Sequence, residues 1–347
     1  MNWSIKSCDG IGPIPTKSAS PDFAREPTRS TVQFVDGGMK SEPLRPASGV
    51  YAAVATPRLS DSIEIDPAAL FDYLDAIVRG GVDGIVLFGS TGEFVHFDLA
   101  DRMRVATLAR KRCRVPLLVN VSHSSLAGAL ELADCAIEAG VSGLLLMPPY
   151  FFRYTEEQIF SFYSEFVSEV DGRAPVYLYN IPQFTNPISA PLAKRLLSTG
   201  AFAGIKDSGG DWQMFEALQA VHANLPFQLL IGSDPLYIRA FPAGANGVVS
   251  GVAGAIPELM ASLDRALRAM DRARAAQSQA RLEEFIGWVE KFPATLAIKR
   301  AACVRGWKLD HSSVPFDQHT LAEIRAFERW FREWLPTVLS ESAPVRA

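Results

Sequence analysis

Short apolar runs alternate with longer segments of helical period from Gly49 to about residue 256. Because a strand covered on both faces needs no polar side, this alternation predicts repeated β-α units and a parallel sheet. The eight predicted strands are Val50–Ala55, Gly84–Phe88, Pro116–Val121, Gly143–Met147, Pro175–Tyr179, Ala203–Lys206, Phe227–Ile231 and Gly247–Ser250.

The segments between the strands carry helix signals. Asp66 and Pro67 match an N-cap followed by proline at the first helical position, and an apolar stripe follows to Val78. The segment Thr155–Gln158 fits a capping box. Eight such strand–helix units predict an α/β fold of the (β/α)8 TIM barrel type. An open doubly wound sheet is the alternative, because periodicity does not report closure.

After the eighth strand the pattern is purely helical. We therefore predict a barrel over residues 47–256 and a C-terminal helical extension packed on it over residues 257–347. Residues 1–46 mix Pro, Ser, Gly, Thr and scattered charge without periodicity, which predicts a disordered N-terminal extension. A start codon placed too far upstream would explain that segment equally well. The four C-terminal helical stripes are Pro257–Met270, Ala273–Phe292, Ala294–Arg305 and Thr320–Leu339.

Composition narrows the classes of partner. The formal net charge is −4 and no basic run stands out, which argues against nucleic acid. The apolar runs fall short of the ~20 residues that a membrane span needs. The cysteines are widely spaced without a C-x-x-C pair, so we interpret them as reduced thiols of a cytoplasmic protein. They are Cys8, Cys113, Cys135 and Cys303.

One lysine ends an apolar predicted strand. Lys206 closes the run Ala203–Lys206, and glycines follow shortly after it. Burial disfavours a charged amine unless the amine is paired or used in chemistry. A neutral amine can attack a carbonyl carbon, so we predict that Lys206 is the reactive centre. The alternative is a lysine whose side chain reaches solvent from the end of the strand.

Two other predicted strands end in polar residues. The segment Gly89–Glu93 places the hydroxyls of Ser90 and Thr91 between glycines, where backbone N–H groups can bind a carboxylate. Tyr179 ends the fifth strand. A simple turn is the alternative for the first motif, and a core or rim aromatic is the alternative for Tyr179. In a barrel, all these strand ends share one mouth, where active sites lie.

These motifs resemble, in order and spacing, those of the dihydrodipicolinate synthase / N-acetylneuraminate lyase family of pyruvate-dependent class I aldolases. The matching segments are Gly89–Glu93, Tyr179–Pro182 and Gly204–Asp207, and Phe292–Leu309 looks like the family's C-terminal helix. The resemblance covers about Gly49 to Asp310 and contains three motifs in register.

The resemblance implies a role for each motif. Lys206 would form a protonated imine with pyruvate or another 2-oxo acid, and Tyr179, helped by Thr91, would move the proton. Ser90 and Thr91 would hold the carboxylate of the 2-oxo acid. The resemblance also implies that no metal or organic cofactor is needed and that the chain forms a homotetramer built from dimers.

The resemblance narrows the substrate less sharply. Dihydrodipicolinate synthases typically carry an arginine where this chain has Phe184, and sialic acid lyases use an Asp-Glu pair where it has Asp234 followed by proline. The motifs look most like those of 4-hydroxy-2-oxoglutarate aldolases and 2-keto-3-deoxy sugar acid aldolases. Ser208 and Asp234 could bind substrate hydroxyls, although capping a helix is the alternative for both. Ser250, at the end of the eighth strand, is a further predicted substrate contact.

The predicted function is therefore a class I aldolase or lyase that releases or adds pyruvate through a lysine imine. A dehydratase or a dihydrodipicolinate-synthase-like enzyme of the same family is the alternative. A non-catalytic barrel that binds 2-oxo acids is the alternative from another class, and the retention of Lys206, Tyr179 and the hydroxyl pair argues against it. Phe151 stands where many relatives carry a tyrosine that crosses a subunit interface, and it would suit a subunit contact.

Overall fold

The structure is a computed structural model that describes residues 46–59, 62–293 and 295–344. Of the predicted N-terminal extension, every residue before Pro46 lies outside the described part of the chain. That prediction therefore stays a prediction.

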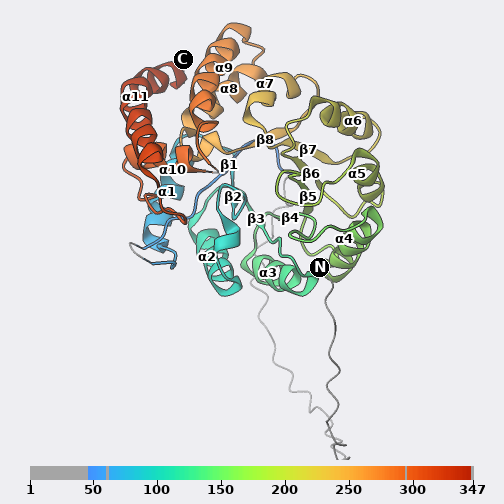
Figure 1. The fold of residues 1–347 in the computed structure, drawn as a ribbon. Helices are drawn as coiled ribbons and strands as arrows, with labels where there is room; N and C mark the ends of the chain where they lie inside the picture. The colour runs from blue at the N-terminus through green and yellow to red at the C-terminus, as the bar shows by residue number, and fades with distance from the viewer. Residues whose placement is uncertain (1–45, 60–61, 294, 345–347) are drawn as a thin grey trace, which may run out of the picture. The chain divides into compact units, whose positions relative to one another are not determined.

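Eight parallel strands form a closed barrel in sequence order, with β8 paired to β1 (Figure 1). This confirms the predicted (β/α)8 TIM barrel and rules out the open doubly wound sheet. Every strand residue is buried except the half-buried Gln228, which is why the strands appear in the sequence as uninterrupted apolar runs. The strands are β1 (Gly49–Ala53), β2 (Gly84–Leu87), β3 (Leu117–Asn120), β4 (Gly143–Leu146), β5 (Val176–Asn180), β6 (Gly204–Asp207), β7 (Gln228–Ile231) and β8 (Gly247–Ser250).

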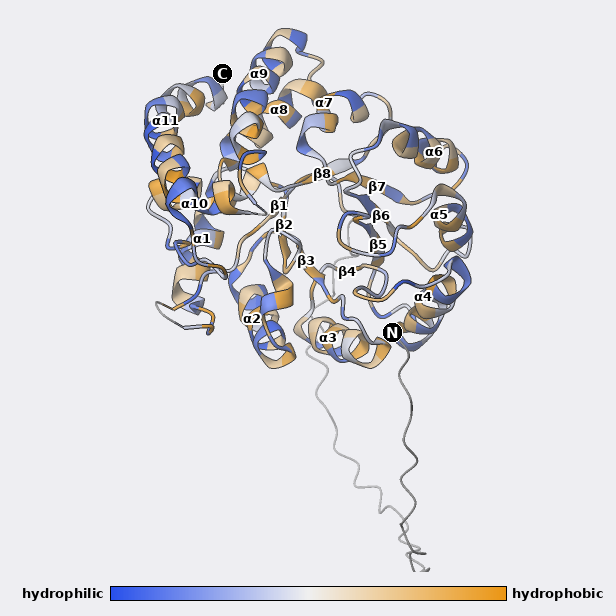
Figure 2. Ribbon diagram, in the orientation of Figure 1, coloured by the Kyte–Doolittle hydropathy of each residue, from blue (hydrophilic) through white to orange (hydrophobic). Residues whose placement is uncertain are grey.

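Helices surround the barrel, and their ribbons carry both hydrophilic and hydrophobic residues, as expected for helices buried on one face (Figure 2). The predicted caps are confirmed: the Asp66 carboxylate accepts from the N–H of Ala69, and Thr155 and Gln158 form a capping box. The α-helices are α1 (Pro67–Arg79), α2 (Leu99–Arg112), α3 (Leu126–Ala139), α4 (Glu156–Val170), α5 (Ala190–Leu197), α6 (Trp212–His222), α7 (Tyr237–Ala240), α8 (Pro257–Arg268), α9 (Arg272–Val289), α10 (Leu296–Val304) and α11 (Gln318–Ser342). The short 3-10 helices are η1 (Phe94–His96), η2 (Asp234–Leu236) and η3 (Val252–Gly254).

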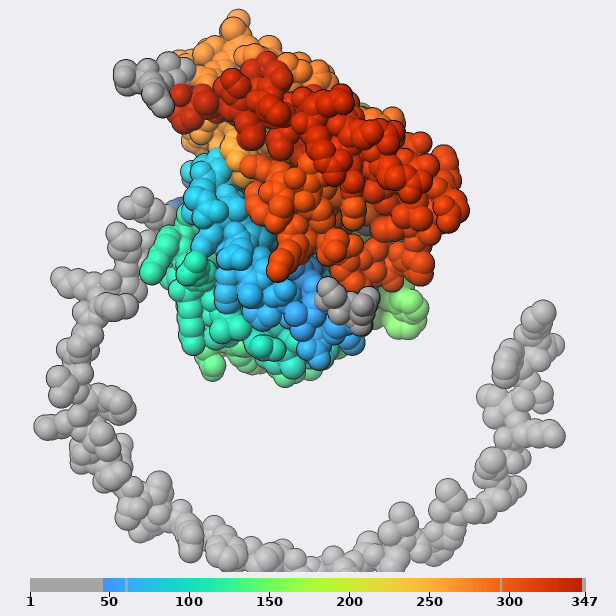
Figure 3. All heavy atoms as spheres, turned by 90° about the vertical axis from the view of Figure 1, so that its left-hand side faces the viewer, coloured from blue at the N-terminus to red at the C-terminus, as the bar shows by residue number. Residues whose placement is uncertain are grey.

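The C-terminal helices lie against the first β-α unit of the barrel. The rings of Tyr73 on α1 and Trp307 after α10 are 5.2 Å apart, and α8 packs against β1. In Figure 3 these helices, coloured orange to red, lie next to the blue residues near the start of the barrel. The division into a barrel ending at residue 256 and a region beginning at residue 257 stays a prediction.

Within the described ranges, no helix is both long and apolar enough to pass through a bilayer.

Candidate active site

Lys206 lies in β6 directly beside Tyr179 of β5. The pairing register places the two residues opposite each other, and the Lys206 Nζ is 3.8 Å from the centroid of the Tyr179 ring. Both residues are buried, with exposed fractions of 3% and 0%. A lysine amine that packs against an aromatic face rather than reaching solvent is not a strand-end lysine extended to the surface.

Tyr179 connects Lys206 to the Ser90 hydroxyl. The Oη of Tyr179 and the Oγ of Ser90 are 3.2 Å apart, within hydrogen-bond distance. Burial raises the pKa of Tyr179, but the positive charge of Lys206 and hydrogen bonds from Ser90 and Lys206 outweigh it, so the net pKa lies below the ordinary value. A phenol with a lowered pKa is better suited to give up and recover a proton near neutral pH.

The turn Gly89–Glu93 presents Ser90 to this site through an unusual backbone. Phe88, directly before the turn, and Glu93, its last residue, both have positive φ values, +57° and +52°. Such conformations cost energy in residues other than glycine and gather at functional sites. Gly92 is required here, because an added Cβ would lie 2.9 Å from the Cα of Phe88.

Thr91 and Asp234 both lie near Gly251, the glycine that follows β8. A Cβ built on Gly251 would lie 3.6 Å from the Thr91 Oγ1 and 3.8 Å from the Asp234 Oδ2. The N–H of Val252 donates to the same Oδ2 at 3.2 Å. Ser250 is fully buried, and its Oγ accepts from the N–H of Ala253 at 2.8 Å. The structure thus brings the ends of β2, β7 and β8 together, while the role of Ser250 as a substrate contact stays a prediction.

Burial raises the pKa of Asp234 to about 6, against the opposing effects of a hydrogen bond from Ser250, backbone N–H groups and the charge of Lys206. Its second carboxylate oxygen, Oδ1, is buried and has no hydrogen-bond partner among the described residues. An unsatisfied buried acceptor in an active site is available to a substrate hydroxyl.

Ser208 and Lys206 both lie next to Gly232, which follows β7. A Cβ on Gly232 would come within 1.9 Å of the Ser208 Oγ and 3.1 Å of the Lys206 Cε, so only glycine leaves room for both side chains. Ser208 does not cap α6, because the side chain of Asp211 accepts from the N–H of Gln213 there. The sequence prediction gave Gly232 no role, although a glycine placed directly after a strand is the signal that could have found it.

A mostly apolar cavity of about 370 Å³ opens beside Ser90 at the mouth of the barrel. Phe184, whose side chain is 68% exposed, lies at its rim. An aromatic ring supplies no charge to bind a second carboxylate. An arginine at the same position could bind one through paired hydrogen bonds. The other residues that line it are Glu93, Phe94, Val95, His96, Met147, Tyr150, Ile181 and Thr185.

In the part of the chain that the structure describes, no group of three or more His, Cys, Asp or Glu side chains could hold a metal ion. The expectation that the chemistry needs no cofactor stays a prediction.

Fold and site together define an eight-stranded α/β barrel with a buried lysine–tyrosine pair and a hydroxyl turn at its strand ends. The sequence profile of the Dihydrodipicolinate synthetase family matches residues 46–330. The chain belongs to this family, which confirms the resemblance of the motifs.

Relatives within the family differ in activity. The chain is 33% identical over 183 residues to a 2-dehydro-3-deoxy-D-gluconate/2-dehydro-3-deoxy-phosphogluconate aldolase of Picrophilus torridus, which covers 52% of this chain and 66% of the relative. The fold of this chain is similar to that of a 4-hydroxy-tetrahydrodipicolinate synthase from Methylacidiphilum fumariolicum SolV. The TM-score is 0.77 at 26% identity, and the match covers 86% of this chain and 100% of the other. A prophage protein of E. coli K12, solved in complex with pyruvate, shares the fold alone, with a TM-score of 0.77, 23% identity, and coverage of 83% of this chain and 98% of the other.

Proposed function

We propose that this chain is a class I aldolase or lyase that forms an imine between Lys206 and pyruvate or another 2-oxo acid. The observation that carries the proposal is the contact series from the Lys206 amine to the Tyr179 ring and from the Tyr179 hydroxyl to Ser90. Family membership supports it, because named relatives include an aldolase and a synthase.

The proposed chemistry begins with attack of the neutral Lys206 amine on the ketone carbon of the 2-oxo acid. Loss of the ketone oxygen as water leaves a protonated imine, which withdraws electrons from the neighbouring carbon. The C–C bond one carbon further along can then break, or form in the reverse direction. As that bond breaks, Tyr179 accepts the proton of the substrate's 4-hydroxyl, an aldehyde leaves and an enamine remains. Tyr179 returns the proton to the enamine carbon, and water then hydrolyses the imine to release pyruvate and the Lys206 amine, while the hydroxyls of Ser90 and Thr91 hold the carboxylate.

For the substrate we propose a 4-hydroxy-2-oxoglutarate or a 2-keto-3-deoxy sugar acid. Phe184 at the cavity rim supplies no charge for a second carboxylate, which favours the 2-keto-3-deoxy sugar acid over the dicarboxylate 4-hydroxy-2-oxoglutarate. Asp234, with its unsatisfied buried Oδ1, and Ser208, beside Lys206, favour a tail with hydroxyl groups.

Borohydride reduction in the presence of pyruvate tests the mechanism. Hydride reduces the imine to an amine, so we expect a stable pyruvyl adduct on Lys206, located by peptide mapping and mass spectrometry, and none in Lys206→Met. Lys299 is an internal control, because it is equally buried but paired with Glu93. A folded chain with no adduct, or with an adduct on another lysine, contradicts the proposal.

A panel of 2-oxo acids then separates the reaction types. An aldolase releases pyruvate from its substrate, whereas a dehydratase leaves the carbon chain intact and expels water. Condensation of pyruvate with an added aldehyde, without cleavage of any 4-hydroxy-2-oxo acid, would favour the synthase alternative.

A further inference from the structure

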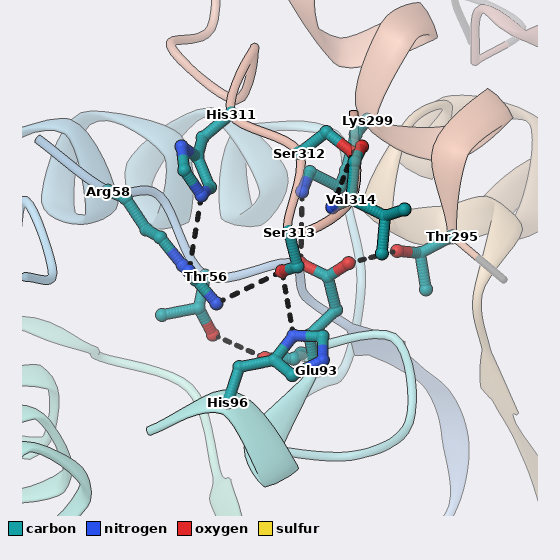
Figure 4. Close-up of polar contacts among 11 residues, drawn as sticks. Thr56, Arg58, Glu93, His96, Thr295, Lys299, His311, Ser312, Ser313 and Val314 are labelled. Carbon is teal, nitrogen blue, oxygen red and sulfur yellow. Dashed lines mark hydrogen bonds and ion pairs between the residues drawn. The ribbon is translucent and has the colours of Figure 1, made fainter. Parts of the chain in front are cut away.

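The turn Gly89–Glu93, which carries the Ser90 and Thr91 hydroxyls, is held from outside the barrel by the C-terminal helix α10. The Nζ of Lys299 lies 2.9 Å from the Oε2 of Glu93, and the Oγ1 of Thr295 donates to the other carboxylate oxygen at 3.4 Å. Figure 4 shows these side chains meeting Glu93 from the C-terminal segment. The Glu93 and Lys299 side chains are only 13% and 5% exposed, so this ion pair lies largely out of water.

Glu93 is two residues from Thr91 and three from Ser90, whose hydroxyls the proposed reaction needs. The N–H of Glu93 donates to the carbonyl of Ser90 at 3.0 Å, which closes the turn. The Oγ1 of Thr56 donates to the carbonyl of Gly92 at 2.9 Å and holds the turn from the β1 side. A change in the position of Glu93 is therefore passed to Ser90 and Thr91 through hydrogen-bonded backbone.

The backbone of Glu93 needs this support. Its φ of +52° is uncommon for a residue with a side chain and costs on the order of 1 kcal/mol or more unless the surroundings impose it. A buried carboxylate that loses its cation is destabilised by several kcal/mol and tends to move toward water or take up a proton. By holding the Glu93 carboxylate in place, Lys299 opposes both a change of the Glu93 backbone to a more common φ and movement of the carboxylate toward water.

A second connection joins the same two regions. The Nη2 of Arg58 donates to the Oγ of Ser313 at 3.3 Å, and that oxygen lies 2.8 Å from the Nδ1 of His96 (Figure 4). The residues after Glu93 are thus tied to the C-terminal segment as well. This limits how far the turn can shift if Lys299 is removed, and a local change rather than loss of the whole segment is expected.

We propose that Lys299 is a positioning residue that fixes the Ser90 hydroxyl against Tyr179 through Glu93. Among the described residues, the Lys299 amine pairs with Glu93 and makes no polar or cation–π contact with Tyr179. The assignment makes the C-terminal helical region part of the active-site architecture. It rests on the proposed function of the Lys206 site.

The test compares Lys299→Met with a control on the same helix. Arg300→Met removes a different ion pair, in which the Arg300 Nε donates to Glu328 at 2.7 Å on α11. Hydrogen exchange is measured without any ligand, followed by borohydride trapping at increasing pyruvate concentrations. Lys299→Arg is the rescue variant, because a cavity of about 220 Å³ beside Lys299 leaves room for a guanidinium. Glu93→Gln, which keeps the shape of the side chain and loses the charge, replaces Lys299→Met if that variant does not fold.

We expect Lys299→Met to speed exchange of the Gly92 and Glu93 amides and to raise the pyruvate concentration for half-maximal trapping about tenfold. Tenfold corresponds to about 1.4 kcal/mol, close to the lower end of the range for one charge-assisted hydrogen bond. The trapping rate at saturating pyruvate changes less. The hydrogen bond from Ser90 helps to lower the pKa of Tyr179, so the Tyr179 limb of the pH profile moves to higher pH. We expect Lys299→Arg to restore the amide exchange rates, the half-saturating pyruvate concentration and the pH profile. We expect Arg300→Met to change none of these.

Unchanged exchange and unchanged half-saturation in Lys299→Met would overturn the inference, as would equal effects in Arg300→Met. Failure of the proposed function has a different signature: the wild-type chain forms no adduct, while the exchange measurement still reports whether Lys299 holds the turn.

Discussion

Two tyrosines on one strand illustrate how strongly environment decides the role of a residue. Tyr177 and Tyr179 of β5 are two positions apart and are both buried. The Oη of Tyr177 accepts from the N–H of Ala47, and burial raises its pKa. Tyr179 has Lys206 and Ser90 beside it, and the net shift of its pKa is downward. Only the second tyrosine is suited to proton transfer near neutral pH.

Asp234 carries a stability cost that its position in the site explains. Its folded pKa of about 6 is above the ordinary 3.8, so the folded state binds more protons than the unfolded state between these values. Stability from this group is therefore present below about pH 4 and is lost as the pH rises to about 6. At pH 7.5 the buried carboxylate opposes folding by on the order of 2–3 kcal/mol.

We expect Asp234→Asn to raise the thermal midpoint by a few degrees at pH 7.5 and to have little effect at pH 4. Turnover of a polyol 2-oxo acid should fall at the same time, because stability and activity trade off at such sites. Calorimetry at both pH values and steady-state kinetics measure the two effects. A midpoint that falls at pH 7.5 would mean that the charged carboxylate serves the fold instead.

At the scale of elements, an aromatic layer joins the C-terminal helices. Phe327 of α11 is fully buried, and its ring centroid lies 5.7 Å from that of Phe331 and 6.1 Å from that of Phe285 on α9. Helix α11 also packs against α8 and α10. Because this layer packs α11 against α8, we expect α9, α10 and α11 to unfold together with the barrel.

Phe327→Ala should lower the free energy of unfolding by about 3–5 kcal/mol, since truncation leaves a cavity that the rings cannot fill. Phe327→Leu should cost less. Calorimetry should show one unfolding transition for both variants, at a lower temperature than for the wild type. A separate early transition would instead identify residues 257–347 as an independently unfolding domain.

Strand positions could be predicted from the sequence because burial on both faces leaves a local signal. Each predicted strand lies within two residues of the observed bounds, as for Val50–Ala55 against Gly49–Ala53. The short α7, of four residues, lacks a stripe long enough to recognise and was not predicted.

The candidate site also contains residues that the sequence predicts and contacts that it does not. Lys206, Tyr179 and Ser90 could be found because each follows an apolar run, and parallel strand ends meet at one mouth. The partner of Glu93 is Lys299, 206 residues later, and that of Asp234 is the backbone of Val252. Such pairings depend on tertiary packing, and neither periodicity nor a local motif reports them.

At the scale of the whole molecule, apolar residues remain uncovered at the barrel mouth. Phe151 is 88% exposed and has a φ of +80°, and its ring lies 5.0 Å from that of Phe152, which is 64% exposed. The Nδ2 of Asn186 donates to the carbonyl of Phe152 at 2.8 Å, which ties this loop to the one that carries Phe184. An exposed apolar group with a strained backbone is costly unless another surface covers it, which supports the predicted assembly of subunits.

We expect the wild-type chain to sediment as an oligomer and Phe151→Asp to shift it toward the monomer, because a charge would be buried without a partner. Aspartate tolerates positive φ better than phenylalanine, so the variant should not lose its fold. Met270→Asp is the matched control: Met270 is 86% exposed with a φ of +55° but lies between α8 and α9, away from the mouth. A monomeric wild type, or equal dissociation of both variants, would contradict an interface at Phe151. If Phe151→Asp dissociates the oligomer and also weakens borohydride trapping, a neighbouring subunit supports the Lys206 site.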